Sequence, residues 1–284
     1  VKGEAMKLKI TTLIENQPGS NHDLINEHGL SMLIQTKGCT ILFDTGQTGA
    51  FIENAKKLNF ELKQIDHVIL SHGHYDHSGG FERLVPFISP EAGIIIGEGF
   101  FDPKYKRVAD NQFVYNGVSF SKQQLMNLPQ SVRTITEEVT NLNSEIILFR
   151  KFKQIKNYEK VNPKFYKETK IGLIQDMFED ELVLGICVEE GLVAVVGCSH
   201  VGISSILDSI VERTGKTILA VIGGLHLIEA DEERINQTIQ EFRNKRIQRI
   251  AVSHCTGDIA VKKMNEEMSD RFEYNNTGHV IEFL

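Results

Sequence analysis

The sequence predicts an α/β fold, built either from two packed sheets flanked by helices or from one mixed sheet. Strand-like runs rich in Val, Ile and Leu alternate with helical segments, hairpins occur together with βα units, and no repeat or low-complexity linker interrupts the chain. The chain has 284 residues and 41% hydrophobic content, which is enough to bury one sizeable core. We therefore expect a single domain over residues 1–284.

The elements follow in order from the periodicity of apolar residues. The predicted strands are Leu8–Ile14, Ser31–Gln35, Thr40–Phe43, His67–Leu70, Gly93–Gly97, Glu181–Val188, Leu192–Val196, Thr217–Ile222, Arg249–Ser253 and His279–Phe283. The predicted helices are Phe51–Leu58, Ile203–Arg213, Ala230–Arg243 and Ile259–Phe272. In the third helix Ile235, Ile239 and Phe242 recur at helical spacing, which indicates one apolar face.

Composition excludes several classes of function. A formal net charge of -7 argues against a general nucleic-acid binder, because neutralising phosphates needs clustered cations. No apolar run approaches the roughly 18 residues of a membrane span, and the N-terminal sequence has no signal-peptide core. The sequence therefore predicts a cytoplasmic protein without a membrane or nucleic-acid partner. The four cysteines form no CxxC pair and are expected to be reduced thiols.

The segment from about residue 101 to residue 170 differs from the rest in charge. It contains 13 Lys and Arg residues against 7 Asp and Glu residues, with aromatic residues interleaved. One interpretation is a solvated basic surface on an ordinary insertion; the other is an inserted lid that attracts a small anionic substrate.

The stretch SHGHYDHSGG, Ser71–Gly80, follows a predicted strand and contains the strongest chemical signal. Neutral imidazole and carboxylate are ligands for zinc, iron or manganese. His72 and His74 are two positions apart, so in extended backbone they point the same way and can share one ion. Asp76 and His77 would then face a second ion. The alternative is a surface cluster of histidines without a metal.

Three further histidines end apolar runs that look like buried strands: LVAVVGCSH ends at His200, ILAVIGGLH at His226 and RIAVSH at His254. In α/β sheets, ligands gather at the carboxyl ends of strands. Taken singly, each would be a core or rim histidine. Together with the cluster at His72, they predict convergence on one site, with metal-ligand roles for His200 and His254 and a weaker case for His226.

Asp44 lies in the motif LFDTG, which also follows a strand. Its carboxylate could orient a ligating imidazole by accepting the other ring N–H. A simple turn role is the alternative. An aspartic-peptidase role is disfavoured, because that chemistry needs two carboxylates sharing a proton and the chain has a single DTG.

SHGHYDH resembles the HxHxDH signature of the metallo-β-lactamase superfamily, and LFDTG resembles the first motif of that family. Further likeness lies in EHGLS, GCSHVGI, GGLHL and SHCTG, which together resemble the subgroup of dihydropterin-methyl-(ribofuranosyl)aminobenzene phosphate synthases. The resemblance covers most of the chain. It implies an αβ/βα four-layer sandwich with a basic insertion, and metals held at one edge.

The resemblance also implies residue roles. His72 and His74 match the first metal pair, Asp76 and His77 the second, and His254 the last metal histidine; Asp44 matches the aspartate that supports a ligand. Asp76 and His226 are our candidate catalytic residues.

Two departures from the family pattern point to a variant site. No histidine occurs between residues 78 and 199, where many members supply another ligand, so His200 is the natural substitute. GCSH stands where many members have a bridging aspartate, and it offers Cys198 either as a thiolate ligand or as a buried small residue. We expect one or two divalent ions, zinc first and iron or manganese as alternatives, with one ion held more firmly.

The predicted function is that of a metal-dependent hydrolase, or of a transferase that displaces diphosphate, acting on a phosphoester- or diphosphate-bearing small molecule. A bound divalent ion would acidify water and polarise a carbonyl or phosphoryl oxygen. If the likeness to the pterin subgroup extends to chemistry, the substrate would be a dihydropterin methyl diphosphate. A non-catalytic metal-binding protein or a redox metalloprotein of the same fold is the alternative.

Overall fold

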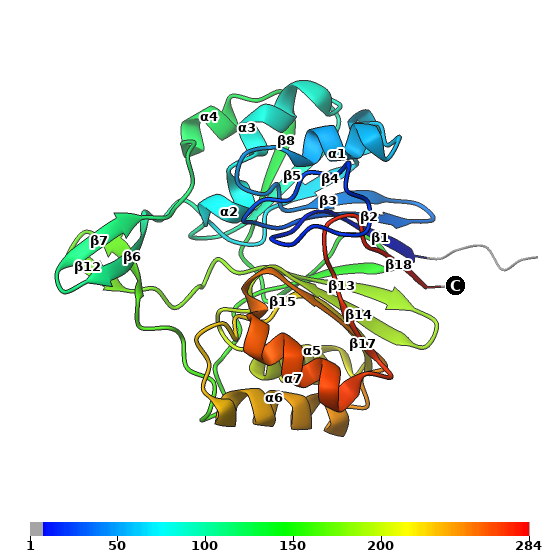
Figure 1. The fold of residues 1–284 in the computed structure, drawn as a ribbon. Helices are drawn as coiled ribbons and strands as arrows, with labels where there is room; N and C mark the ends of the chain where they lie inside the picture. Colours follow the sequence, from blue (N-terminus) through cyan, green and yellow to red (C-terminus); the bar gives the residue numbers. More distant parts are fainter. Residues whose placement is uncertain (1–7, 284) are drawn as a thin grey trace, which may run out of the picture. The chain divides into compact units, whose positions relative to one another are not determined.

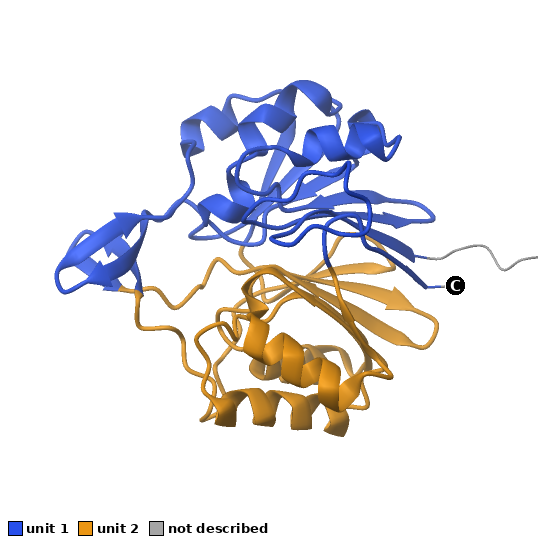
Figure 2. Cartoon of the chain, viewed as in Figure 1, with its two compact units in different colours: residues 1–135, 165–174, 276–284 blue, residues 136–164, 175–275 orange. Residues whose placement is uncertain are grey.

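The structure, a computed structural model, describes residues 8–283 (Figure 1) and divides the chain into two compact units (Figure 2). The first unit comprises residues 1–135, 165–174 and 276–284, and the second comprises residues 136–164 and 175–275. Among the described residues, no helix combines the length and the apolar character that crossing a membrane would need.

The first unit contains a seven-stranded mixed sheet in the order β18-β1-β2-β3-β4-β5-β8. The strands are β1 (Leu8–Ile14), β2 (Ser31–Thr36), β3 (Thr40–Phe43), β4 (His67–Ile69), β5 (Gly93–Gly97), β8 (Ser131–Ile135) and β18 (Val280–Phe283). β3, β4, β5 and β8 run parallel, so their carboxyl ends lie at one edge. That edge is where LFDTG and SHGHYDH begin.

Short helices cover one face of this sheet (Figure 1). They are α1 (Phe51–Lys57), α2 (Tyr75–Ser78), α3 (Phe81–Leu84) and α4 (Lys122–Met126), with 3-10 turns at Leu62–Gln64 and Val85–Phe87. Phe51 and Phe81 from the helices pack against Leu42, Val68 and Ile94 from the strands, all fully buried or nearly so. This apolar cluster fixes the helices over the sheet and holds the loops at its edge.

A separate four-stranded sheet has the order β12-β11-β6-β7. Its strands are β6 (Lys104–Ala109), β7 (Gln112–Tyr115), β11 (Phe165–Thr169) and β12 (Gly172–Gln175). Lys104 and Phe165 are buried, whereas most other side chains of this sheet are exposed.

The second unit contains another seven-stranded mixed sheet, in the order β17-β16-β15-β14-β13-β10-β9. Its strands are β9 (Val139–Asn141), β10 (Ile146–Phe149), β13 (Val183–Val188), β14 (Gly191–Val196), β15 (Ile218–Gly224), β16 (Arg249–Ser253) and β17 (Phe272–Tyr274). The helices are α5 (Ile203–Thr214), α6 (Glu232–Asn244) and α7 (Asp258–Met268), with a 3-10 turn at His254–Thr256.

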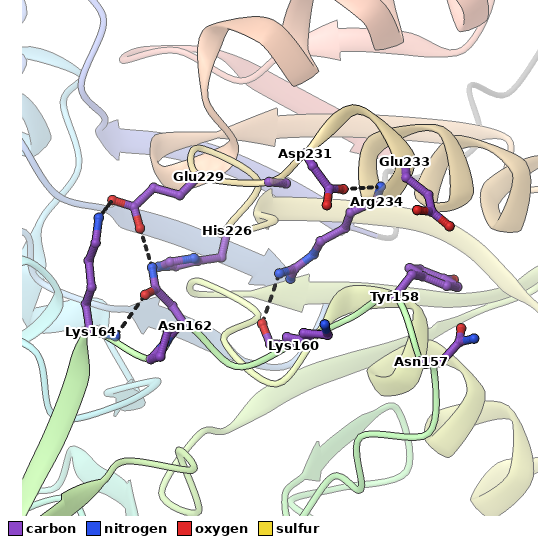
Figure 3. A pocket seen from close by; sticks show the side chains of 12 residues that line it. Asn157, Tyr158, Lys160, Asn162, Lys164, His226, Glu229, Asp231, Glu233 and Arg234 are labelled. Atoms are coloured by element: carbon purple, nitrogen blue, oxygen red, sulfur yellow. Dashed lines mark hydrogen bonds and ion pairs between the residues drawn. The ribbon is translucent and has the colours of Figure 1, made fainter.

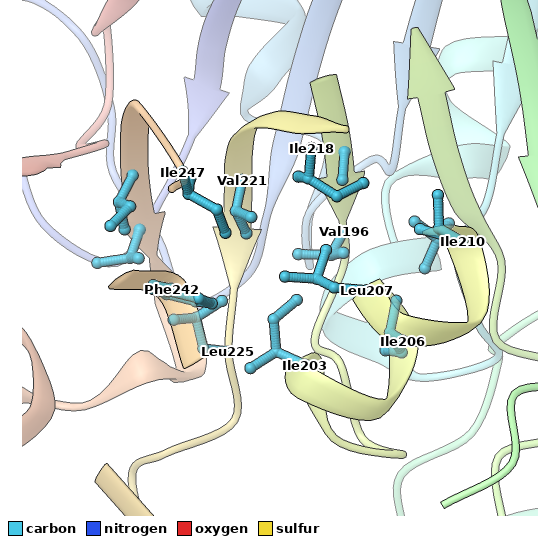
Figure 4. Packing of buried hydrophobic residues seen from close by; sticks show 14 of the residues in the cluster. Val196, Ile203, Ile206, Leu207, Ile210, Ile218, Val221, Leu225, Phe242 and Ile247 are labelled. Carbon is cyan, nitrogen blue, oxygen red and sulfur yellow. The ribbon is translucent and has the colours of Figure 1, made fainter. Parts of the chain in front are cut away.

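Helix α5 shows how this unit packs (Figure 4). Ile203, Ile206, Leu207 and Ile210 recur at helical spacing and are fully buried against the sheet. Because β14, β15 and β16 run parallel beneath them, the segments that follow these three strands emerge at one edge.

All ten predicted strands are present, with ends within two residues of those expected. The fourth helix was predicted to reach Phe272 and is wrong at that end: α7 stops at Met268, and Phe272 pairs with Ile250 in the parallel sheet. No strand was predicted between residues 98 and 180, yet this segment supplies strands to all three sheets.

Candidate metal centre

In the first unit, Asp44 and Ser71 follow the neighbouring parallel strands β3 and β4, which places them side by side. The fully buried Asp44 carboxylate accepts the Ser71 backbone N–H at 2.7 Å and the Ser71 hydroxyl at 2.7 Å. It also accepts the Nδ1–H of His77 at 2.6 Å. These charge-assisted hydrogen bonds leave Nε2 as the nitrogen with which His77 can bind a cation.

The ring nitrogens of His72 and His74 lie close together. The Nε2 of His72 and the Nδ1 of His74 are 3.0 Å apart, and the Nδ1 of His72 is 2.9 Å from the Ser71 hydroxyl. Two nitrogens bonded to one tetrahedral ion at about 2.0–2.1 Å would be roughly 3.3 Å apart. Burial, with the nearby His77 and His74, holds the pKa of His72 well below its usual value, so its ring is neutral and able to ligate. The residues fit a divalent metal.

Asp76 and His77 form the second pair on the short helix α2. The Oδ2 of Asp76 is 3.9 Å from the Nε2 of His77. Gly73 brings this loop close to the rest of the unit, since a Cβ at that position would lie 2.2 Å from the carbonyl oxygen of Phe100. The glycine is therefore required by the close backbone approach.

The structure adds residues to this cluster that sequence reasoning missed. The Nε2 of His28 is 3.3 Å from the Oδ2 of Asp76, although half of the His28 side chain is exposed. His28 lies in EHGLS, a motif we associated with the family without giving the histidine a role, so the signal was present. Phe165 places its ring 5.2 Å from that of His74, and Lys104 is buried next to Gly73. Nothing in the basic segment singled out these two residues.

In the second unit, three predicted histidines follow the adjacent parallel strands β14, β15 and β16. The rings of His200 and His226 are 4.3 Å apart. Phe178 stacks on His200 with a centroid distance of 3.8 Å and an interplanar angle of 4°. The buried carboxylate of Glu181 accepts the backbone N–H of His200 at 2.9 Å. His200 is therefore held from two sides.

Cys198 and His254 come together at the same edge. Their ligand atoms, with that of Cys255, all lie within 4.8 Å of one another, a spacing that could hold a metal ion. The Cys255 thiol also approaches the carbonyl oxygen of Cys198 at 3.6 Å. Thiolate and imidazole donors suit zinc or iron.

Several residues at the two strand edges have positive φ angles without being glycine. The angles are +62° at Asp44, +59° at Ser199, +46° at His226 and +55° at His254. This conformation is unusual for residues with a side chain, and such strain clusters at functional sites.

His226 is buried, and this burial, with the positive charges of Arg234 and His254, lowers its pKa to about 4. The imidazole is thus neutral near pH 7. The residue roles assigned from the sequence remain predictions, but each unit brings its own candidates together.

Known proteins resemble this chain in sequence and in structure. A sequence profile described as the metallo-beta-lactamase superfamily matches residues 25–205. A protein of Methanocaldococcus jannaschii named 7,8-dihydropterin-6-methyl-4-(beta-D-ribofuranosyl)-aminobenzene-5'-phosphate synthase is 34% identical, covering 99% of this chain and 98% of the relative.

Solved structures are similar as well. Tm1679, described as a metal-dependent hydrolase of the beta-lactamase superfamily, superposes with a TM-score of 0.83 at 27% identity, covering 97% of this chain and 99% of that one. A diphosphatase of the PhnP family gives a TM-score of 0.56 at 14% identity over 98% of each chain, which shows a shared fold alone. These matches confirm the predicted resemblance and the predicted α/β sandwich fold class.

Proposed function

The chain belongs to the metallo-β-lactamase superfamily, and from this premise we propose that it is a metal-dependent enzyme acting on a phosphoester- or diphosphate-bearing small molecule. The observation that supports the proposal most strongly is the buried network around Asp44. A carboxylate that takes the Nδ1–H of His77, next to two imidazole nitrogens 3.0 Å apart, is an arrangement that prepares neutral histidines for a cation.

In the first unit we propose His72, His74, Asp76 and His77 as metal ligands, and in the second unit we propose His200 and His254. Zinc is the first candidate, and Cys198 is a possible additional donor. A divalent ion held there would supply Lewis acidity and a more acidic water. Because GCSH has no carboxylate to neutralise two ions, we expect one firmly held and one labile ion.

The protein's own groups would assist in several ways. Asp44 and Ser71 fix the orientation of His77 and His72, and His28 is close enough to Asp76 to hold a proton near that carboxylate. Lys104 contributes a buried positive charge beside this cluster, which favours an anionic substrate. We propose that the four-stranded sheet of β6, β7, β11 and β12 is the substrate-facing part of the basic insertion.

Two reaction classes are proposed for this site. One is displacement of diphosphate from a dihydropterin methyl diphosphate by an aminobenzene carbon, in which a C–C bond replaces the C–O bond and the ring carbon loses a proton; it is supported by the relative that is named as a synthase and matches nearly the whole chain. Hydrolysis is supported by the likeness to Tm1679, which is described as a metal-dependent hydrolase. We rank the transferase first, because that relative has the higher sequence identity.

The first test is metal content. Protein purified without added metal should contain about one divalent ion by elemental analysis, and His72→Ala should remove it. Turnover of a panel of phosphodiesters, lactones, thioesters and pterin diphosphates should fall by more than about 100-fold in the same variant, since even groups that only orient ligands cost about 10–100-fold.

His22→Ala is the matched control, because His22 is an exposed histidine of the same unit. Metal-free protein with full activity would disprove the metal mechanism. Bound metal without turnover on any member of the panel would support the non-catalytic alternative, and an iron-oxo absorption band would support the redox alternative.

A further inference from the structure

The second unit contains a cavity of about 480 Å³ (Figure 3), and of its lining residues only His226 has a role predicted from the sequence. One wall is the segment between Asn157 and Lys164, and the other is the turn from Glu229 into the first turn of α6. His226, a candidate catalytic residue, also lines it. A cavity of this size is typical of small-molecule sites.

Arg234 is the notable charge in this cavity. Its Nη1 donates to the backbone carbonyl of Lys160 at 3.0 Å, while its buried Nε–H has no hydrogen-bond partner in the described part of the chain. No carboxylate of the described residues forms an ion pair with its guanidinium, although the carboxylates of Glu159 and Asp231 are near enough to oppose the effect of burial on its pKa. Arg234 thus has more N–H donors than the described residues satisfy. Burial lowers its pKa, but a guanidinium group stays charged in proteins.

Two of the three acidic residues of the lining, Glu229 and Asp231, are engaged elsewhere, and the third is Glu233. Glu229 accepts from Lys164 at 2.7 Å and also from the side-chain amide of Asn162. Asp231 accepts the backbone N–H of Arg234 at 2.8 Å and caps helix α6. Figure 3 shows the Arg234 side chain reaching toward the backbone carbonyl of Lys160, with the Asp231 carboxylate bonded to the backbone N–H of Arg234 instead.

A partly buried guanidinium whose Nε–H has no acceptor is costly unless another oxygen group satisfies it. Its planar fork matches the two oxygens of a carboxylate or phosphate, which makes such a group the natural complement. The hydroxyl of Tyr158 and the amide of Asn157 line the same cavity and could supply further hydrogen bonds.

We propose that Arg234 forms an oxyanion-binding subsite that receives a phosphate or carboxylate group of the substrate. This inference rests on the proposed function, to which it adds a place for the non-reacting end of the molecule. Because His226 shares the cavity, a small molecule anchored on Arg234 would extend toward that candidate catalytic residue.

The test is to measure, by calorimetry, the binding of inorganic phosphate, diphosphate and acetate to metal-stripped protein. Wild type should bind at least one of these anions saturably, and Arg234→Ala should weaken that binding by about 30-fold or more. Arg234→Lys should lose part of the affinity, because lysine keeps the charge but not the fork. Phosphate and acetate distinguish a phosphorylated substrate from a carboxylated one.

Arg243→Ala is the matched control, since Arg243 lies on the same helix, is more exposed and pairs with Glu267. If circular dichroism shows that Arg234→Ala is misfolded, anion binding is measured on Arg234→Lys and Tyr158→Phe instead. Absent anion binding, or equal binding by wild type and the Arg234 variants, would overturn the subsite even if metal-dependent turnover is found. Anion binding lost with Arg234 but no metal or turnover would overturn the proposed function and leave the subsite.

Discussion

Replacing Asp44 with asparagine should destabilise the protein and weaken metal binding at the same time. The Oδ2 of Asp44 accepts two hydrogen bonds, from the Ser71 hydroxyl at 2.7 Å and from the Nδ1–H of His77 at 2.6 Å, while Oδ1 accepts the Ser71 N–H at 2.7 Å. An asparagine must place its NH₂ group against one of these sets of donors. In either orientation the new NH₂ group faces a buried N–H or O–H donor of Ser71 or His77, and neither has an acceptor.

The magnitude follows from these contacts. Hydrogen bonds to a buried charged group are worth about 1.5–3 kcal/mol each, and an unsatisfied buried donor costs about 1–3 kcal/mol. We expect Asp44→Asn to lower the free energy of unfolding by about 3 kcal/mol, and Ser71→Ala by about 1 kcal/mol because the bond from His77 remains. The positive φ of +62° at Asp44 does not complicate the comparison, since asparagine tolerates this conformation as well.

The assay is denaturant unfolding of metal-stripped protein at pH 7, together with competition for metal against a chelator. Metal affinity should fall by about 10–100-fold, as expected when the group orienting a ligating imidazole is changed. Asp66→Asn is the control, because exposed Asp66 accepts a single backbone N–H, from Thr40 at 2.8 Å. A variant at Asp44 that unfolds within about 0.5 kcal/mol of wild type would refute the reasoning.

Three further outcomes are expected. Gly73→Ala should cost about 1–3 kcal/mol by overpacking against the Phe100 carbonyl, whereas a Cβ at Gly38 meets no atom within 4 Å; equal unfolding midpoints would contradict this. Burial of the Asp208 carboxyl group by itself would raise its pKa, but hydrogen bonds from Lys245 and Lys156 outweigh this effect, so the pKa of Asp208 is lowered. Its stabilisation should therefore be present near pH 7 and be lost as the pH falls through that lowered pKa, so urea midpoints of wild type and Asp208→Asn should converge in acid and differ at neutral pH. Burial, with the charge of Asp66, raises the pKa of Cys39 to about 11, so iodoacetamide at pH 8 should label it far more slowly in the native than in the unfolded protein, as read by peptide mass spectrometry.

Most of the two large sheets could be predicted from the sequence because their strands are buried and apolar. Runs such as Leu192–Val196 and Arg249–Ser253 can be recognised as strands from their local composition, and glycine or the histidine motifs mark where they end. The small sheet of β6, β7, β11 and β12 could not be predicted in this way. Its strands are short and largely exposed, and β6 pairs with β11 across some 60 residues of chain.

In the candidate site, too, local sequence patterns predicted some features and others depended on the tertiary structure. By itself, the sequence determined which residues are candidate ligands and that they follow strands, since HxHxDH and the histidines after β14, β15 and β16 are local patterns. Only the tertiary structure decided which nitrogen of His77 is presented, that His28 approaches Asp76, and that Arg234 lines a cavity with its Nε–H unsatisfied by the described residues. The physical reason is that hydrogen bonding and burial depend on groups brought together from distant parts of the chain, as Asp44 is with His77, and no local pattern records that meeting.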